Sequence, residues 1–405
     1  MLAQTSNDPI WNIISMFFFF TVFGWIYPRM MLHQTLWKLE RDTRTLEEWG
    51  AQTTELVSGR MSKHNKKVKD AVSDFMNFFM VTPVDMDPSG IVKKLDRSLN
   101  DQKTRFGIFV ETHSDEKDPE MRANLEDGLG GAWVVNYLSK VVRHYVEIVR
   151  KYKNPYIAIP IQIQLPMIMD FAKSYMKATE SICNGDPIGD GIGPYIAAHL
   201  IGDSEPIEMK GDEMVYSEKE INGRKCIITK ARGPGSRVGD PGKGMEKLIE
   251  KYKPTRIITI DAAGKMEGEK LGSVAEGVGV AMGGPGVERF YIEEKTTTHG
   301  IPIDAVVVKM KPEEAILAMR EEILDAAPKA IELVTQAVGR ANQGENVIIL
   351  GVGNTCGVGN NKPSLDEAEK KIRKNAKKLK KEEEDDGKEK KSFLDKINPF
   401  SASLN

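Results

Sequence analysis

Five glycine-rich loops in the second half of the chain carry the residues best suited to bind a ligand. Two of the aspartates in these loops stand at the ends of predicted elements: Asp190 lies at the start of a predicted helix, and Asp261 ends a predicted strand. Glycine permits positive φ angles and lets the backbone approach a ligand closely. The loops are GDPIGDGIGP (185–194), GPGSRVGDPGKG (233–244), DAAG (261–264), VAMGGPGVE (280–288) and GVGNTCGVGN (351–360).

The candidate ligand-binding residues are loop glycines and one asparagine. They are Gly191, Gly233, Gly235, Gly284, Gly286, Gly351, Gly353 and Asn354. The 233–244 loop contains a lysine but lacks the GxxxxGK[ST] spacing that cradles nucleotide phosphates, so we do not expect a P-loop.

Short apolar runs next to these loops predict the strands that position them. Helical stretches separate the runs, and this alternation favours an α/β fold with a mostly parallel, buried sheet. Ligands bind such sheets at the carboxyl ends of the strands, so the loops should share one edge. The predicted strands are 224–230, 256–261, 303–309 and 346–350, and the predicted helices are 193–201, 244–252 and 312–342. Glycine becomes frequent only from Gly185, so we place the α/β domain at residues 185–362.

Several motifs within residues 185–310 follow one another in a characteristic order. They are DGIGP (190–194), GPG to GKG (233–244), KPTRIITIDA (253–262), GGPG (283–286) and GIPI (300–303). This order resembles the spore germination protease family and, more distantly, the hydrogenase maturation endopeptidases. The resemblance implies a phosphorylase- or hydrolase-like fold and a pair of acidic residues, which fall on Asp190 and Asp261.

The implied catalytic pair would perform acid–base chemistry. Two facing carboxyl groups split their pKa values, so that Asp190 and Asp261 would serve as one base and one acid. They would activate water on an amide, or hold a divalent metal through their oxygen atoms. His299, which precedes the GIPI strand, is a third candidate metal ligand.

The chain departs from the protease pattern at two places. In those proteases a strand ending in G-[LI]-G-N comes just before the first aspartate, whereas here such a strand stands at the C-terminus, in NVIILGVGNT (346–355). We therefore expect a circular permutation that places Asn354 beside Asp190. In addition, AAGKMEGE follows Asp261 in place of the family's Ala-Leu-Ala-Ala continuation, which leaves the substrate open.

The first part of the chain predicts a membrane anchor. Residues 9–28 carry no charge, and a helix of about 20 residues crosses the hydrocarbon core of a bilayer, about 30 Å thick. The alternatives are a buried core helix and a cleaved signal peptide, but a signal peptide would have basic residues before the apolar run. Here they follow it, as Arg29, Lys38, Arg41 and Arg44. This flank predicts a single-pass protein of the cell membrane, with residues 1–8 outside and the body cytoplasmic.

Residues 29–184 read as an all-α region. Its first leucines recur at helical spacing, which fits either a coiled-coil stalk that forms a homo-oligomer or, as we favour, a helix packed on its own domain. Residues 363–405 are dominated by Lys, Glu and Asp, which predicts a solvated helix or a disordered tail. Anionic lipid and the ribosome are its candidate partners. The whole chain resembles an archaeal family known as domain of unknown function 1512, which implies the anchor and the helical segment and brings no established activity.

Composition excludes several classes of protein. Three scattered cysteines and six histidines without ligand spacing suggest neither a disulfide framework nor a zinc site. A net charge of −2 gives no argument for nucleic-acid binding. Three functions remain: a membrane-tethered hydrolase or peptidase using Asp190 and Asp261, a non-catalytic ligand-binding domain, and a scaffold. An enzyme requires the two carboxyl groups to converge within about 5–6 Å in one cavity, or jointly around a metal. A binding module would neutralise them with Lys or Arg, and a scaffold would have no cavity and would carry its apolar patch on the helical region.

Overall fold

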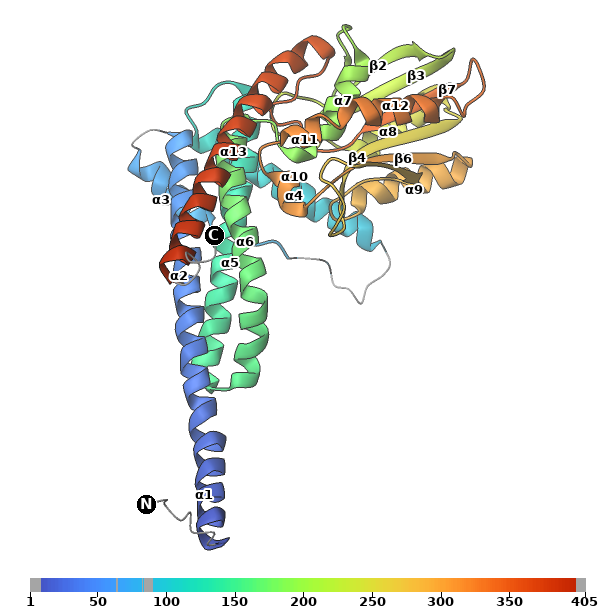
Figure 1. Ribbon diagram of the computed structural model, residues 1–405. Helices are drawn as coiled ribbons and strands as arrows, with labels where there is room; N and C mark the ends of the chain where they lie inside the picture. The colour runs from blue at the N-terminus through green and yellow to red at the C-terminus, as the bar shows by residue number, and fades with distance from the viewer. Residues whose placement is uncertain (1–8, 63–64, 82, 84–89, 398–405) are drawn as a thin grey trace.

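The computed structural model describes residues 9–62, 65–81, 83 and 90–397, so the predicted extracytoplasmic segment 1–8 lies outside it. The molecule consists of a long helical stalk and an α/β head (Figure 1). The stalk and its neighbours are α1 (Pro9–Thr21), the π-helical turn η1 (Val22–Ile26), α2 (Tyr27–Met61), α3 (Lys66–Phe75), α4 (Ile91–His113), α5 (Pro119–Tyr152) and α6 (Pro155–Cys183).

Helix α2 packs against α5 and α6 of the same chain. Leu39 and Leu46 of α2 form a buried cluster with Val142 and Val146 of α5 and with Leu165 of α6. The predicted leucine periodicity therefore serves packing within the chain. Homo-oligomerisation through this helix stays a prediction.

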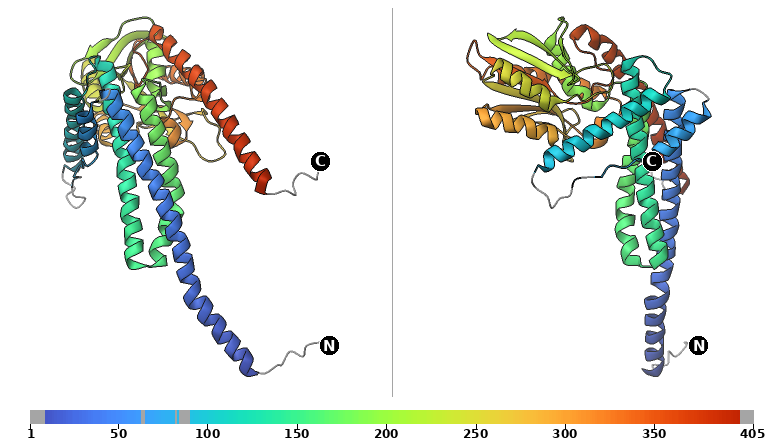
Figure 2. Two further views of the ribbon diagram at one scale, coloured as in Figure 1. Left: turned by 90° about the vertical axis from the view of Figure 1, so that its left-hand side faces the viewer. Right: turned by 180° about the vertical axis from the view of Figure 1, so that it is seen from behind.

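Helix α1 continues the rod beyond the packed part of the stalk (Figures 1 and 2). Its phenylalanines are exposed, with Phe17 at 75% and Phe18 at 69% of their full accessible area. Among the described residues, one helix contains a stretch long and apolar enough to cross a membrane, and it lies at this end of the chain.

The head contains a seven-stranded sheet in the order β1-β2-β3-β7-β4-β6-β5. The strands are β1 (Ile207–Met209), β2 (Met214–Ile221), β3 (Arg224–Ala231), β4 (Arg256–Gly264), β5 (Val274–Val278), β6 (Ile303–Met310) and β7 (Asn346–Gly351). The four predicted strands are confirmed as β3, β4, β6 and β7, and these central strands are parallel.

The expectation of a mostly parallel sheet is wrong, because the sheet is mixed. Strands β1 and β2 extend one side and β5 the other, and all of these pairings are antiparallel. These outer strands are partly solvent-exposed and carry charges, as in the SEKE run of β2 and Glu276 of β5. They therefore lack the continuous apolar pattern that reveals a buried parallel strand.

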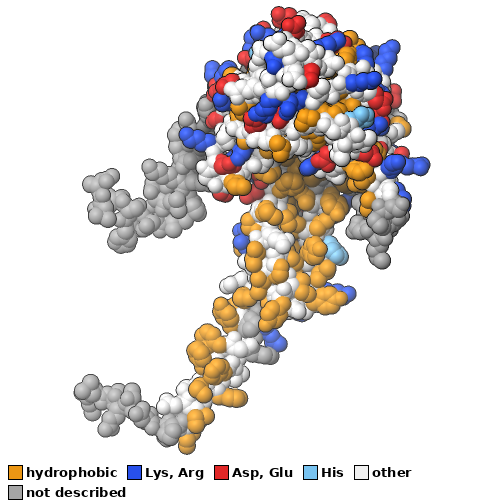
Figure 3. Space-filling model, turned by 90° about the vertical axis from the view of Figure 1, so that its right-hand side faces the viewer, with side chains coloured by type: hydrophobic (Ala, Val, Ile, Leu, Met, Phe, Trp, Pro, Cys, Tyr) orange, Lys and Arg blue, Asp and Glu red, His pale blue; other side chains and the backbone are white. Residues whose placement is uncertain are grey.

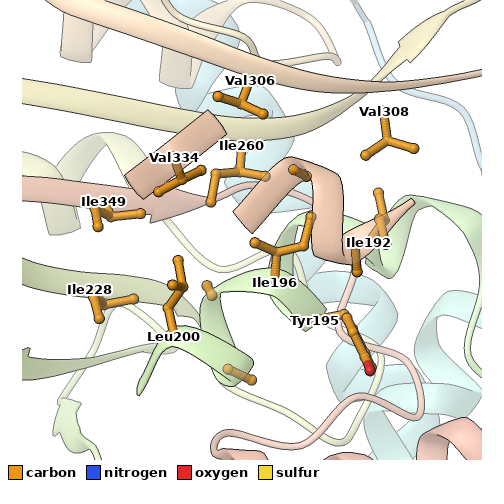
Figure 4. Close-up of a cluster of buried hydrophobic side chains, with 14 of the residues drawn as sticks. Ile192, Tyr195, Ile196, Leu200, Ile228, Ile260, Val306, Val308, Val334 and Ile349 are labelled. Atoms are coloured by element: carbon orange, nitrogen blue, oxygen red, sulfur yellow. The ribbon is translucent and has the colours of Figure 1, made fainter. Parts of the chain in front are cut away.

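Helices cover both faces of the sheet. They are η2 (Gly189–Gly191, a 3-10 turn), α7 (Ile192–Ile201), α8 (Pro241–Tyr252), α9 (Val287–His299), α10 (Pro312–Ile316), α11 (Glu321–Leu324), α12 (Ala327–Val338) and α13 (Lys362–Ile397). On one face, Ile196 of α7 and Val334 of α12 pack against strand residues such as Ile228 and Ile349 (Figure 4). The alternate strand residues, including Ile227 and Ile348, pack against α8 and α9.

The charged C-terminal segment is helical, which is one of the two alternatives that its composition predicts. It forms helix α13, which contacts α7 and α11 and then leads away from the head (Figure 2). Its first turns bury Leu365, Ala368, Ile372 and Ala376. These apolar residues recur every three or four positions and form one narrow stripe, which the surrounding lysines and glutamates conceal in the composition.

Candidate functional site

A cavity of about 450 Å³ lies at the carboxyl ends of β3, β7 and β4. Its walls are residues 351–353 at the end of β7, residues 239–241 at the start of α8, and residues 282–288 at the start of α9. Helix α4 of the helical region closes another side with residues spaced at three, four and seven positions. These are Asp96, Leu99, Asn100 and Lys103. The helical region and the head therefore build the site together.

Asp190 and Asp261 both line this cavity. Asp261 lies in the carboxyl-terminal half of β4, which continues to Gly264, and it is only 4% exposed. Its Oδ1 accepts a hydrogen bond from the Ala262 N–H at 2.7 Å, and its Oδ2 accepts one from the Gly283 N–H at 3.1 Å. Asp190 lies in η2, where its Oδ2 accepts the N–H of Asn354 at 2.8 Å.

The two carboxyl groups influence each other's titration. Burial and the charge of Asp190 raise the pKa of Asp261 to about 8, against the opposing effect of its two N–H donors. The apolar surroundings also raise the pKa of Asp190, while the Asn354 N–H opposes this shift. At neutral pH Asp261 is therefore mainly protonated, and the pair can supply one acid and one base.

The cavity contains little positive charge to neutralise these groups. Its lining includes Asp96, Asp240 and Glu288 besides the central pair, and Lys103 is its single Lys or Arg. The Lys103 ammonium lies 2.5 Å from Glu213 and 3.9 Å from Asp240, so its charge is directed to them rather than to Asp190 or Asp261. Asp240 pairs with Lys103 and Lys243, but within the described ranges no Lys or Arg forms an ion pair with Asp190 or Asp261, so the neutralised pair expected of a binding module is not found.

The predicted proximity of Asn354 and Asp190 is confirmed. Strand β7 lies between β3 and β4, so the loop that follows it passes directly beside η2. Gly353 has a φ of 130°, and a Cβ atom at this residue would lie 2.0 Å from the Asp190 carbonyl oxygen. The circular permutation relative to the protease family stays a prediction, which this neighbourhood supports.

The candidate glycines divide into two groups. Gly284, Gly286, Gly351 and Gly353 line the cavity. Gly191, Gly233 and Gly235 do not; they serve packing. A Cβ atom at Gly233 would lie 1.9 Å from the Val358 carbonyl oxygen, and the Gly235 N–H donates to Glu120 of α5 at 2.7 Å.

His299 is not brought to the cavity. It is the last residue of α9, is exposed, and precedes the start of β6 at Ile303. Because Ile303 pairs with Ile257 at the amino end of β4, His299 lies near the edge opposite to Asp261. Within the described ranges, no group of three His, Cys, Asp or Glu side chains could hold a metal ion. The side chains that line the cavity therefore fit a protein-held metal centre poorly.

A polar network behind Asp190 was not predicted. The side chain of Asn354 donates to Asp127 of α5 at 2.7 Å and accepts from the Ser236 hydroxyl at 3.0 Å and from the Cys356 N–H at 2.8 Å. Ser236 also bonds directly to Asp127. The sequence signal was an aspartate followed by three glycines in LEDGLGG, within a predicted helix.

A buried lysine and Asn360 connect the glycine-rich loops 233–244 and 351–360 through hydrogen bonds. Lys230, at the end of β3, is fully buried, and its ammonium donates to the Ala231 carbonyl at 2.8 Å and to Asn360 at 3.0 Å. Asn360 in turn exchanges hydrogen bonds with the backbone of Gly233. Burial lowers the pKa of Lys230 to about 7. This residue lies outside the cavity lining, and its contacts are structural.

We expect Asn354→Ala to lower the free energy of unfolding by about 1–3 kcal/mol, because it leaves the buried Cys356 N–H without an acceptor and removes the amide donor to the Asp127 carboxyl group. Asn354→Asp keeps an acceptor oxygen and should cost less below the pKa of the new carboxyl group. Thermal and urea unfolding in detergent would measure both. The control Asn342→Ala, at an exposed position, should change stability by no more than about 0.5 kcal/mol. Equal effects of Asn354→Ala and Asn342→Ala would contradict the role assigned to the network.

Comparisons with known proteins identify a family. A model described as the N-terminal domain of a protein of unknown function (DUF1512) matches residues 13–185. A second, described as the C-terminal domain of unknown function (DUF1512), matches residues 188–359. No curated protein and no solved structure matches the chain significantly. The two matches meet at the junction between the helical region and the head, and together they cover most of the chain, which therefore belongs to the DUF1512 family.

Proposed function

We propose that this protein is a membrane-tethered hydrolase that cleaves peptide bonds with Asp190 and Asp261. The observation that carries the proposal is the presence of both carboxyl groups in one cavity at the carboxyl edge of the sheet. Their hydrogen-bond donors are backbone N–H groups, so each keeps an oxygen lone pair for substrate or water. The resemblance to the spore germination proteases supports peptide as the substrate class.

The proposed reaction uses the two groups in opposite protonation states. Ionised Asp190 takes a proton from the attacking water, while protonated Asp261 donates its proton to the carbonyl oxygen of the amide. The water oxygen bonds to the carbonyl carbon and forms a gem-diol. The diol then collapses: a diol hydroxyl returns its proton to Asp261, the C–N bond breaks, and Asp190 passes its proton to the leaving nitrogen. Both carboxyl groups end in their starting states.

The charge of the cavity supports a basic substrate. Asp96 accepts hydrogen bonds from Asn100 at 2.8 Å and from the Tyr291 hydroxyl at 3.2 Å, and Glu288 accepts the Gly242 N–H at 2.6 Å. These partners are neutral, so a positively charged side chain would improve the electrostatic balance of the cavity. We therefore expect cleavage beside lysine or arginine.

The exposed apolar surface of α1 supports attachment to a membrane. The basic residues that follow this helix favour a cytoplasmic head in a single-pass protein. The archaeal origin implied by the resemblance stays a prediction, as do contacts of α13 with anionic lipid or the ribosome. A ligand-binding domain without catalysis is the alternative function, and a pure scaffold is disfavoured by the lined cavity.

The test is hydrolysis of a peptide mixture by the full-length protein in ¹⁸O-labelled water. Cleavage would place a solvent oxygen in each new carboxyl terminus, which mass spectrometry detects. We expect Asp190→Asn to lower the rate by about 10²–10⁴-fold. Asp203→Asn, which removes an exposed carboxyl group outside the cavity, should leave it unchanged. Peptides that bind to the wild type but acquire no label would favour the binding module and overturn the hydrolase.

A further inference from the structure

The turn between α5 and α6 exposes an unusual group of side chains. Tyr152 at the end of α5 is 62% exposed, and Tyr156 in the first turn of α6 is 83% exposed. Lys151 and Lys153 lie beside them, also exposed. The turn itself is well formed, because Lys153 adopts a left-handed conformation and the Asn154 side chain caps α6 through the Tyr156 N–H at 2.9 Å. We call residues 151–156 the hairpin tip.

The first half of α6 extends this exposed surface. Tyr156, Ile159, Ile163 and Met167 recur at spacings of three and four residues, so they lie on one face of the helix, and all four are exposed. No charged residue occurs between Lys153 and Asp170. Figure 3 shows hydrophobic side chains gathered along the stalk and continuing down to α1, whereas the charges gather on the head.

Packing fixes the height of the hairpin tip along the rod formed by α1 and α2. Val149 of α5 and Ala158 of α6 pack against Leu32 of α2. Leu32 lies four residues beyond the apolar segment that ends at residue 28, which is about 6 Å along the helix. The headgroup layer is about 5–7 Å thick on each side of a bilayer. If residues 9–28 (α1, η1 and the first residues of α2) span the hydrocarbon core, the hairpin tip therefore reaches the headgroups, and Figures 1 and 2 show α1 projecting beyond it.

We infer that the hairpin tip rests on the headgroup layer of the membrane that residues 9–28 cross. The inference rests on the proposed membrane attachment. Tyrosine favours this layer because its ring is apolar and its hydroxyl polar. Lysine ammonium groups are attracted to anionic lipid phosphates at the same depth. The two tyrosines and two lysines thus match a lipid surface, and the level set by Leu32 places them there.

This second contact would orient the head. One helix alone leaves the body free to tilt, whereas a helix and a hairpin tip on the same surface hold the stalk upright. Residues 158–183 of α6 then separate the head from the lipid by about 38 Å at 1.5 Å per residue. The cavity would therefore face peptides dissolved in the cytoplasm rather than segments within the bilayer.

The test uses single cysteine variants of the full-length protein in vesicles of phosphatidylcholine and phosphatidylglycerol. Cys183, Cys226 and Cys356 are buried, so a thiol-reactive fluorophore would label an introduced exposed cysteine selectively. Tyr156→Cys places the fluorophore at the hairpin tip. Lys177→Cys is the matched control, because it is exposed on the same helix about 31 Å farther from the tip.

A lipid with a nitroxide on its headgroup should quench the fluorophore at residue 156 several-fold more strongly than the fluorophore at residue 177. Flotation of the vesicles separately reports whether the protein is attached. Protein that floats but shows equal quenching at both residues would overturn the hairpin contact and leave the anchor standing. Protein that does not float would overturn both. Efficient cross-linking between two copies at residue 156, without quenching, would identify the face as an interface between copies and overturn the inference.

Discussion

Asp261→Asn is expected to lower the rate of peptide hydrolysis by about 10²–10⁴-fold, because an amide cannot donate the proton that the carbonyl oxygen must receive. The fold should persist. Asn keeps one oxygen that can accept from Ala262 or Gly283, and it is neutral, as Asp261 mainly is below pH 8. Activity against the peptide mixture and the circular dichroism spectrum of the variant would check both expectations.

The same substitution should change how stability depends on pH. The pKa of Asp261 is about 8 in the folded protein, against about 3.9 in an unfolded chain. Between these values the folded state holds a proton that the unfolded state has released. The stability contributed by this proton is therefore full below pH 4 and is lost as the pH rises through about 8. Relative to Asp261→Asn, the melting temperature of the wild type should fall across this range.

The rate of peptide hydrolysis should also depend on the protonation of Asp261. The wild-type rate should decline above about pH 8 as Asp261 loses its proton. Asp203→Asn is the control, and its melting temperature should track that of the wild type at every pH. An Asp261→Asn variant that retains full activity would end the catalytic role of this residue. If the melting temperature of the Asp261→Asn variant depended on pH as that of the wild type does, the pKa of Asp261 would not be raised in the folded protein.

The meeting of Asp190 and Asp261 was predictable because each marks an element end. Asp261 follows the apolar run of a predicted strand, and Asp190 precedes a predicted helix that should pack against the sheet. Parallel strands align their carboxyl ends, so residues 71 positions apart arrive at one edge. The mixed nature of the sheet escaped prediction because β2 and β5 carry exposed charges.

The contribution of the helical region to the site was not predictable. Helical periodicity shows which face of α4 or α5 is buried, but it does not show what covers that face. Lys103 and Asp127 reach the head only through contacts distant in sequence, with Glu213 and Asn354 respectively. The glycines present the same difficulty. Gly351 lines the cavity whereas Gly233 makes room for a carbonyl oxygen, and the residue type is the same in both roles.

Gly353→Ala should destabilise the protein and disrupt the site together. Its φ of 130° is a conformation that residues with a side chain rarely adopt, and this strain costs about 1–3 kcal/mol. The added methyl group would also lie 2.0 Å from the Asp190 carbonyl oxygen. Such an overlap typically costs a further ~1–3 kcal/mol. The carbonyl cannot move aside freely, because η2 is held by the Gly189 N–H bond to Leu317 at 3.0 Å.

The relief of this overlap would have to separate residue 353 from η2, and with it the Asn354 N–H from the Asp190 carboxylate. We therefore expect a lower melting temperature and a loss of hydrolysis in the same variant. Gly264→Ala is the matched control, since this glycine ends β4 with open space around it and an ordinary φ. A Gly353→Ala variant as stable and as active as Gly264→Ala would show that η2 can shift without losing Asp190, and that the close approach of the two loops is not needed to position the carboxyl group.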